Sequence, residues 1–141
     1  MSPWCLLYGE PESRSANDKK DVLRARSFAY CTRKVLAGVP EPFHVYMGAR
    51  EAPDSWFEGV DKFVERVLIS AGDHECLRDD TRGFANRFIM HHGKTHFIVQ
   101  ENGVHNDPFY DFLVGERKPS ELTLAILGWL LEGFESPVAG A

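Results

Sequence analysis

Cysteine is scarce in this sequence of 141 residues, and its three cysteines stand far apart. Cys5, Cys31 and Cys76 form no Cys-x-x-Cys pair and no Cys/His spacing of the kind that holds structural zinc. An odd number of unevenly spaced cysteines also gives no sign of a disulfide framework. We therefore expect free thiols in a reducing intracellular compartment, the cytoplasm first and an organelle as the alternative. We predict no metal site and no cofactor.

Long apolar runs are missing as well. The N-terminal letters MSPWCLLYGE contain neither the basic start nor the apolar stretch of a secretory signal. The most apolar run, LTLAILGWLL at 122–131, is much shorter than the roughly 20 residues that a membrane-spanning helix needs. The sequence therefore predicts a soluble protein without a membrane span.

An excess of positive charge is also absent. The chain has 16 Lys and Arg against 21 Asp and Glu, which gives a net charge of −5. Nucleic-acid-binding proteins usually concentrate positive charge on one face, so we expect no nucleic-acid partner. The length and the hydrophobic fraction of 43% suit a single core. We predict one globular domain over 1–141, leaving open a mobile N-terminal arm at 1–16 and the oligomeric state.

Motifs that mark common catalytic sites are not found. The sequence has no Gly-x-Ser-x-Gly and no Ser-x-x-Lys, so nothing in it predicts a serine hydrolase. Gly93-Lys94-Thr95 resembles the end of a phosphate-binding loop, but Phe88 stands where that loop needs its first glycine. These residues identify no known family.

What the sequence does contain is a set of clear helical patterns. A helix is expected at about 18–37, with Asn17 as its N-cap. A second is expected at about 55–72, because apolar residues recur there every three or four positions. Ser120 precedes a third helix at about 121–132, which is apolar nearly all round and is therefore expected to be buried in this domain or in a partner.

Strand patterns follow in the middle of the chain. Gly93-Lys94 and Asn102-Gly103 suit two-residue hairpin turns. The strands expected around these turns are 84–92, 95–101 and 104–106, and PFHVYMG at 42–48 is a fourth candidate. The charged segment 73–83 is expected to be irregular. The predicted fold is α+β: a three- to four-stranded antiparallel meander with about three helices packed on it.

This register suggests a catalytic face. His91 would lie opposite His96, and these two histidines are candidates for an acid–base pair. Arg87, Gln100 and His105 would form a polar row on the same face and orient an anionic substrate. The plain alternative is that the histidines crowd an exposed hairpin tip. A metal would need a third ligand such as His44 or Asp107, and no ligand spacing supports one.

The aromatic and acidic loops suggest a different role, and we expect it to be the main one. Aromatic side chains outside the clear helices are typical anchors of protein interfaces, and acidic loops suit a basic partner. The residues expected to contact a partner are Asp73, Glu75, Asp79, Asp80, Phe109, Tyr110 and Phe112. The leading prediction is a non-catalytic interaction protein, either a small inhibitor of the immunity or anti-defence type or an accessory subunit of a larger assembly. A small enzyme that uses the histidine face is the second prediction.

Overall fold

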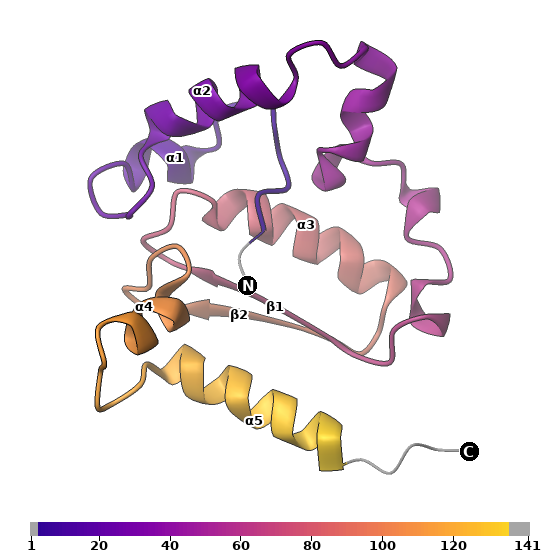
Figure 1. Ribbon diagram of the computed structural model, residues 1–141. Coiled ribbons are helices and arrows are strands. Elements are labelled where there is room, and N and C mark those ends of the chain that lie inside the picture. Colours follow the sequence, from indigo (N-terminus) through magenta and orange to yellow (C-terminus); the bar gives the residue numbers. More distant parts are fainter. Residues whose placement is uncertain (1–2, 136–141) are drawn as a thin grey trace. The chain divides into compact units, whose positions relative to one another are not determined.

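The computed structural model describes residues 3–135 of the chain (Figure 1). The chain divides into two compact units, Met1–His105 and Asn106–Ala141. Each unit has its own helices, and we describe them separately. The single domain predicted from the sequence stays a prediction, as does the mobile arm, although Cys5, Leu7 and Ser13 of that segment are buried.

The first unit is built on two parallel strands joined by a helix. Strand β1 (Val67–Gly72) pairs with β2 (Thr95–Gln100), so that Val67 lies opposite Thr95 and Gly72 opposite Gln100. Helix α3 (Arg78–His91) connects the two strands and packs on both of them (Figure 1). Parallel strands need a crossover of this kind, whereas a meander needs only tight turns. The predicted antiparallel meander is therefore wrong, and this part of the fold is a β–α–β unit.

Helix α3 occupies the segment that was predicted as the first strand of the meander. Its buried residues Thr81 and Ala85 and the preceding Leu77 are spaced four positions apart, and buried His92 follows seven positions after Ala85, so they lie along one face. Asp79 and Asp80 lie in the first turn, where negative charge interacts favourably with the helix dipole. The helix ends just before Gly93, so this glycine stops a helix rather than turning a hairpin. The segment expected to be irregular contains the first turns of α3.

The predicted helix at 55–72 is replaced by short 3-10 helices and by strand β1. Helices η3 (Asp54–Trp56) and η4 (Val60–Lys62) are separated by Gly59, whose φ of 73° is left-handed and interrupts a regular helix. The β-branched residues that follow belong to β1. The apolar periodicity in this segment does not mark one buried helix face, since Trp56, Phe63 and Val64 are exposed while Phe57 and Ile69 are buried.

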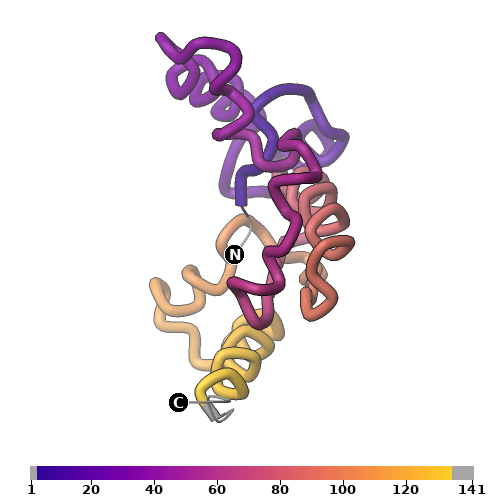
Figure 2. Tube along the Cα trace, turned by 90° about the vertical axis from the view of Figure 1, so that its right-hand side faces the viewer, coloured from indigo at the N-terminus to yellow at the C-terminus, as the bar shows by residue number. Residues whose placement is uncertain are grey.

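The N-terminal part of this unit carries helices α1 (Glu12–Ala16) and α2 (Ala25–Val35) and the 3-10 helices η1 (Glu41–Tyr46) and η2 (Ala49–Glu51). Their path can be followed in Figure 2. The predicted helix begins later than expected because the Asp18 carboxylate accepts the N–H of Ala25 at 2.6 Å and so caps α2 from outside. The strand expected at 42–48 is η1.

A small apolar cluster forms the core of the first unit. Phe28 of α2 packs with Cys76 and Leu77, which lie between β1 and α3, and Trp4 and Leu23 cover the cluster. The rings of Trp4 and Phe28 meet edge to face, with their centroids 5.5 Å apart. The cluster fixes the segment that links β1 to α3.

The second unit contains helices α4 (Asp107–Leu113) and α5 (Glu121–Glu135). The carboxylate of Asp111 accepts hydrogen bonds from the Ser120 N–H at 2.8 Å and from the Thr123 hydroxyl at 2.5 Å, and it thereby ties the two helices together. Ser120 accepts the N–H of Thr123 at 3.2 Å, so the predicted cap and the predicted last helix are confirmed. The strand expected at 104–106 is not formed, and α4 follows at once. No helix within residues 3–135 is long and apolar enough to cross a membrane.

Candidate active site

The two strands end side by side, and the segments that follow them are bonded to each other. Gly72 and Gln100 are the last residues of their strands and lie opposite one another. The N–H of Asp73 donates to the carbonyl of Gln100 at 2.9 Å, and the N–H of His74 donates to that of Gly103 at 3.0 Å. Sites in open α/β sheets commonly lie at the carboxyl ends of the strands. The loops after β1 and β2 are therefore the place to look for chemistry.

Glycine permits this close approach of the two loops. A Cβ atom on Gly72 would overlap the carbonyl group of Gly103, so no larger residue fits at the end of β1 without moving the other loop. Asn102 turns the second loop with a left-handed φ of 56°. The turn is centred on Glu101 and Asn102, because the N–H of Gly103 donates to the carbonyl of Gln100 at 3.3 Å. The predicted Asn102-Gly103 hairpin turn is therefore wrong, and the chain leads back to the first loop instead of into a third strand.

The two loops bring Glu75 and His105 into direct contact. Glu75 Oε1 lies 2.6 Å from His105 Nδ1; the glutamate side chain is 0% exposed and the histidine side chain 17%. The other carboxylate oxygen accepts the N–H of Gly72 at 3.0 Å. An ionised carboxylate can only accept hydrogen bonds, so Nδ1 carries the proton and a neutral ring has its lone pair on Nε2. A buried acid that orients a histidine in this way leaves Nε2 able to accept a proton, which is how a general base is built.

Asn17 supports the acidic member of this pair. Its amide nitrogen donates to the carbonyl of Asp73 at 2.9 Å and to that of Glu75 at 3.0 Å, and the side chain is almost completely buried. These bonds fix the backbone of the turn that carries Glu75. The carboxylate of Glu75 is thus fixed directly by the N–H of Gly72 and indirectly by Asn17, which holds the backbone of its turn.

The neighbouring cysteine is not a nucleophile. Burial and the carboxylate of Asp21 raise the pKa of Cys76 to about 12, and burial and Asp80 raise the pKa of Cys5 to about 12. Because the thiolate is the reactive form, both thiols are inert near neutral pH.

The histidine pair predicted from the meander does not form. His91 lies in the last turn of α3 with its ring 5.8 Å from that of Phe57, and His96 is exposed on β2 opposite Leu68. The predicted pairing is wrong because the chain before Gly93 is helical. Within the described residues, no group of three or more His, Cys, Asp or Glu side chains is placed to hold a metal ion.

The predicted substrate-binding residues are also dispersed. Arg87 donates to the carboxylate of Asp54 at 2.6 Å and to the carbonyl groups of Arg50 and Ala52, so it anchors the segment around η2 and η3. Gln100 ends β2. His105 does lie at the candidate site, although as the partner of Glu75 rather than of Arg87.

Most of the acidic residues predicted to contact a partner are engaged within the first unit. Glu75 and Asp80 are 0% exposed, and Asp80 pairs with Arg14 at 2.7 Å. Asp79 pairs with Arg78 at 2.9 Å, while Asp73 begins the turn after β1. In the second unit, the predicted aromatic residues are exposed on α4: Phe109 by 58%, Tyr110 by 38% and Phe112 by 67%.

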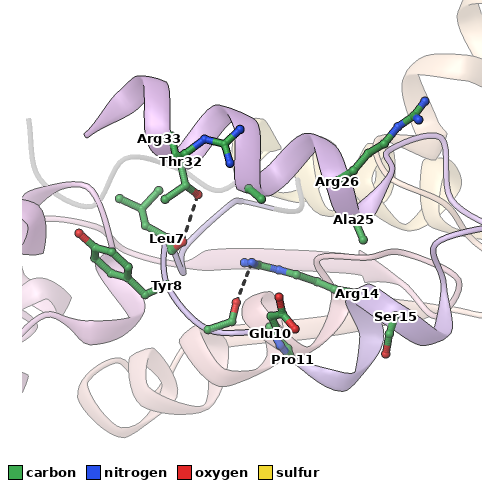
Figure 3. A pocket seen from close by; sticks show the side chains of 12 residues that line it. Leu7, Tyr8, Glu10, Pro11, Arg14, Ser15, Ala25, Arg26, Thr32 and Arg33 are labelled. Atoms are coloured by element: carbon green, nitrogen blue, oxygen red, sulfur yellow. Dashed lines mark hydrogen bonds between the residues drawn. The ribbon is translucent and has the colours of Figure 1, made fainter. Parts of the chain in front are cut away.

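A separate cavity of about 550 Å³ lies between the N-terminal segment and α2 (Figure 3). Arg14 extends between these two walls and donates to the carbonyl of Gly9 at 3.0 Å. Its charge is balanced by buried Asp80, and neither Glu75 nor His105 lines the cavity. The cavity is therefore distinct from the acid–base pair.

Comparison with known proteins gives a fold but no family. No protein-family model and no curated protein matches the sequence. The chain is similar in structure to carboxyl esterase 2 of the mycorrhizal fungus Tuber melanosporum, with a TM-score of 0.68 and 14% sequence identity. The match covers 91% of this chain and 41% of the esterase, so the chain spans less than half of that protein's length. The likeness at this identity shows the shared fold alone.

These findings change the interpretation of the sequence. The α+β class is wrong, and neither the comparisons nor the described residues support the predicted inhibitor or immunity role, which we do not retain. Sequence reasoning placed His105 on a polar face but took Glu75 for a surface residue. Their positions in the chain could have indicated that Glu75 and His105 meet, because each residue lies a few positions after one of the two strands of the β–α–β unit.

Proposed function

We propose that this chain takes part in the hydrolysis of carboxylic esters, with His105 as the general base and Glu75 as the acid that orients it. The observation that carries the proposal is the 2.6 Å contact between Glu75 Oε1 and His105 Nδ1 at the carboxyl ends of two parallel strands. The structural likeness to a carboxyl esterase agrees with this choice of reaction at the level of the fold.

The chemistry follows from the tautomer of the histidine. His105 Nε2 takes the proton of a hydroxyl group whose oxygen attacks the ester carbonyl carbon. Buried Glu75 stabilises the imidazolium that results, and the imidazolium then gives its proton to the departing alcohol. A water molecule releases the acyl group by the same sequence of steps. The chain's own part is to hold and move this one proton.

The nucleophilic hydroxyl is proposed to come from a polypeptide segment outside these 141 residues. The sequence has no Gly-x-Ser-x-Gly, the motif that presents a reactive serine in α/β hydrolases. The chain also corresponds to only 41% of the esterase that it resembles. We therefore assign the base and its orienting acid to this chain, and the nucleophile to a segment that docks with it.

A protein partner remains part of the proposal, now with a defined role. The second unit exposes apolar side chains such as Phe112, Leu113 and Val114, by 67%, 78% and 72%. Apolar surface of this kind suits a polypeptide rather than a nucleic acid. The partner would be the polypeptide that contributes the nucleophile.

The test measures ester hydrolysis by the chain as it is recovered, gently and with any bound polypeptide, from its own source. With p-nitrophenyl butyrate as substrate, His105→Ala and Glu75→Gln are expected to lower kcat/KM by at least about 100-fold, as for the loss of a general base. His96→Ala is the matched control and is expected to stay within about twofold, since His96 is exposed on β2. Equal hydrolysis by all three variants and the wild type would overturn the proposal.

A further inference from the structure

We infer that Asp21 is a positioning residue that sets the separation of Glu75 and His105. The catalytic consequence rests on the proposed function, but the positioning itself is a property of the chain alone. Asp21 lies in the segment between α1 and α2 and is 7% exposed. Nothing in its local sequence distinguishes it from the neighbouring surface residues.

The carboxylate of Asp21 reaches the backbone of both active-site loops. Its Oδ2 accepts the N–H of Cys76 at 2.7 Å, and Cys76 directly follows Glu75. Its Oδ1 accepts the N–H of His105 at 2.9 Å and that of Val22 at 2.7 Å. One rigid group of three atoms therefore joins the loop of the acid to the loop of the base.

The chemistry of this clamp requires a carboxylate. Three N–H groups point at two oxygen atoms, and hydrogen bonds to an ionised acceptor are roughly twice as strong as neutral ones. The same donors also satisfy a charge that would otherwise be costly to bury. An asparagine has nearly the same shape, but one of the two oxygen atoms is replaced by an NH2 group that can only donate, so at least one N–H group would face another donor.

The position of Asp21 also separates its role from that of Asn17. Asn17 bonds to carbonyl groups of the Glu75 turn, so it supports the acid. Asp21 instead accepts hydrogen bonds from both loops that form the Glu75–His105 contact, through the N–H groups of Cys76 and His105. A change at Asp21 is therefore expected to alter the distance between Oε1 and Nδ1.

The test compares Asp21→Asn with Asp18→Asn in the complete chain. Asp18 is a matched control because it also accepts a backbone N–H, that of Ala25 at 2.6 Å, but contacts neither active-site loop. The readout is the Nδ1 proton of His105, observed by NMR with ¹⁵N-labelled histidine at one fixed pH. Asp21→Asn is expected to shift this proton to higher field and to speed its exchange with water by about tenfold. Asp18→Asn is expected to leave it where it is in the wild type.

A measurement on the wild type keeps the inference testable if Asp21→Asn does not fold. The backbone N–H groups of Cys76 and His105 are expected to be protected from hydrogen exchange as strongly as those of β1. Exchange of either amide at the rate of an open loop would overturn the inference, as would an unshifted Nδ1 proton in folded Asp21→Asn.

The outcome for Asp21 is independent of the outcome for the reaction. If Glu75→Gln leaves hydrolysis unchanged, the proposed function fails while the NMR result for Asp21 stands. If hydrolysis depends on Glu75 as proposed, Asp21→Asn is expected to lower kcat about tenfold with KM within about twofold, and to add nothing further in the Glu75→Gln background. An additive loss in the double variant would show that Asp21 does not act through the pair.

Discussion

Glu75 and Asp80 are both fully buried carboxylates, and their partners give them different roles. Glu75 meets a histidine, which can accept and release a proton near neutral pH, whereas Asp80 meets Arg14, which stays charged. The first contact suits proton transfer and the second suits structure. Both residues belong to the same acidic segment of the sequence, and only the side chains that they contact distinguish their roles.

The ion pair of Arg14 and Asp80 is expected to dominate the stability of the segment before α2. Arg14→Leu leaves Asp80 buried without its closest cation and is expected to lower the free energy of unfolding by about 3 kcal/mol. Arg24→Leu is the control, because Arg24 pairs with Asp18 at the surface and such pairs contribute about 0–1 kcal/mol. Urea denaturation of both variants measures the difference, and equal effects would contradict this assignment.

The effect of Arg14→Leu also depends on pH in a defined direction. Burial raises the pKa of Asp80, and the hydrogen bond from Arg14 opposes that rise. Without Arg14 the folded-state pKa is higher still, so stability is retained at low pH and lost as the pH rises through that pKa. The variant is therefore expected to approach the wild type in stability in acid and to fall furthest behind it at neutral pH.

At the scale of the element, the close approach of the two loops depends on the end of β1. Gly72→Ala is expected to lower the free energy of unfolding by about 1–3 kcal/mol, since the new methyl group overlaps the carbonyl of Gly103. It is also expected to lower ester hydrolysis, because it pushes the His105 loop away from Glu75. Gly93→Ala is the matched control, as a Cβ there meets nothing within 4 Å. Equal stability and activity of the two variants would show that the approach of the loops is not critical.

The elements also show what the sequence could and could not predict. The last helix and its Ser120 cap followed from local rules, and so did the strand at 95–100. Segment 84–92 was mistaken because Gly93 suits both a hairpin turn and a helix end, and packing against β1 decides between them. The residues of β1 were taken for the end of a helix because a short apolar run has no decisive period.

At the scale of the whole chain, the candidate site depends on contacts that no local pattern encodes. Glu75 and His105 are 30 residues apart and meet because β1 and β2 are parallel. A meander of the same residues would have placed His105 beside Gln100 and left Glu75 in a loop. The polar character of His105 was therefore predictable from the sequence, but the identity of its partner was not.

The central claim is that this chain supplies the base for a serine held by another polypeptide segment. The most direct measurement is fluorophosphonate labelling of the species that contains the chain, isolated gently from its own source, because the probe reacts with serines activated by a neighbouring base. We predict a labelled serine in the species recovered with the wild-type chain, and at least about 100-fold slower labelling when the chain carries Glu75→Gln. Recovery of the chain without a labelled serine, or equal labelling with both forms, would contradict the account.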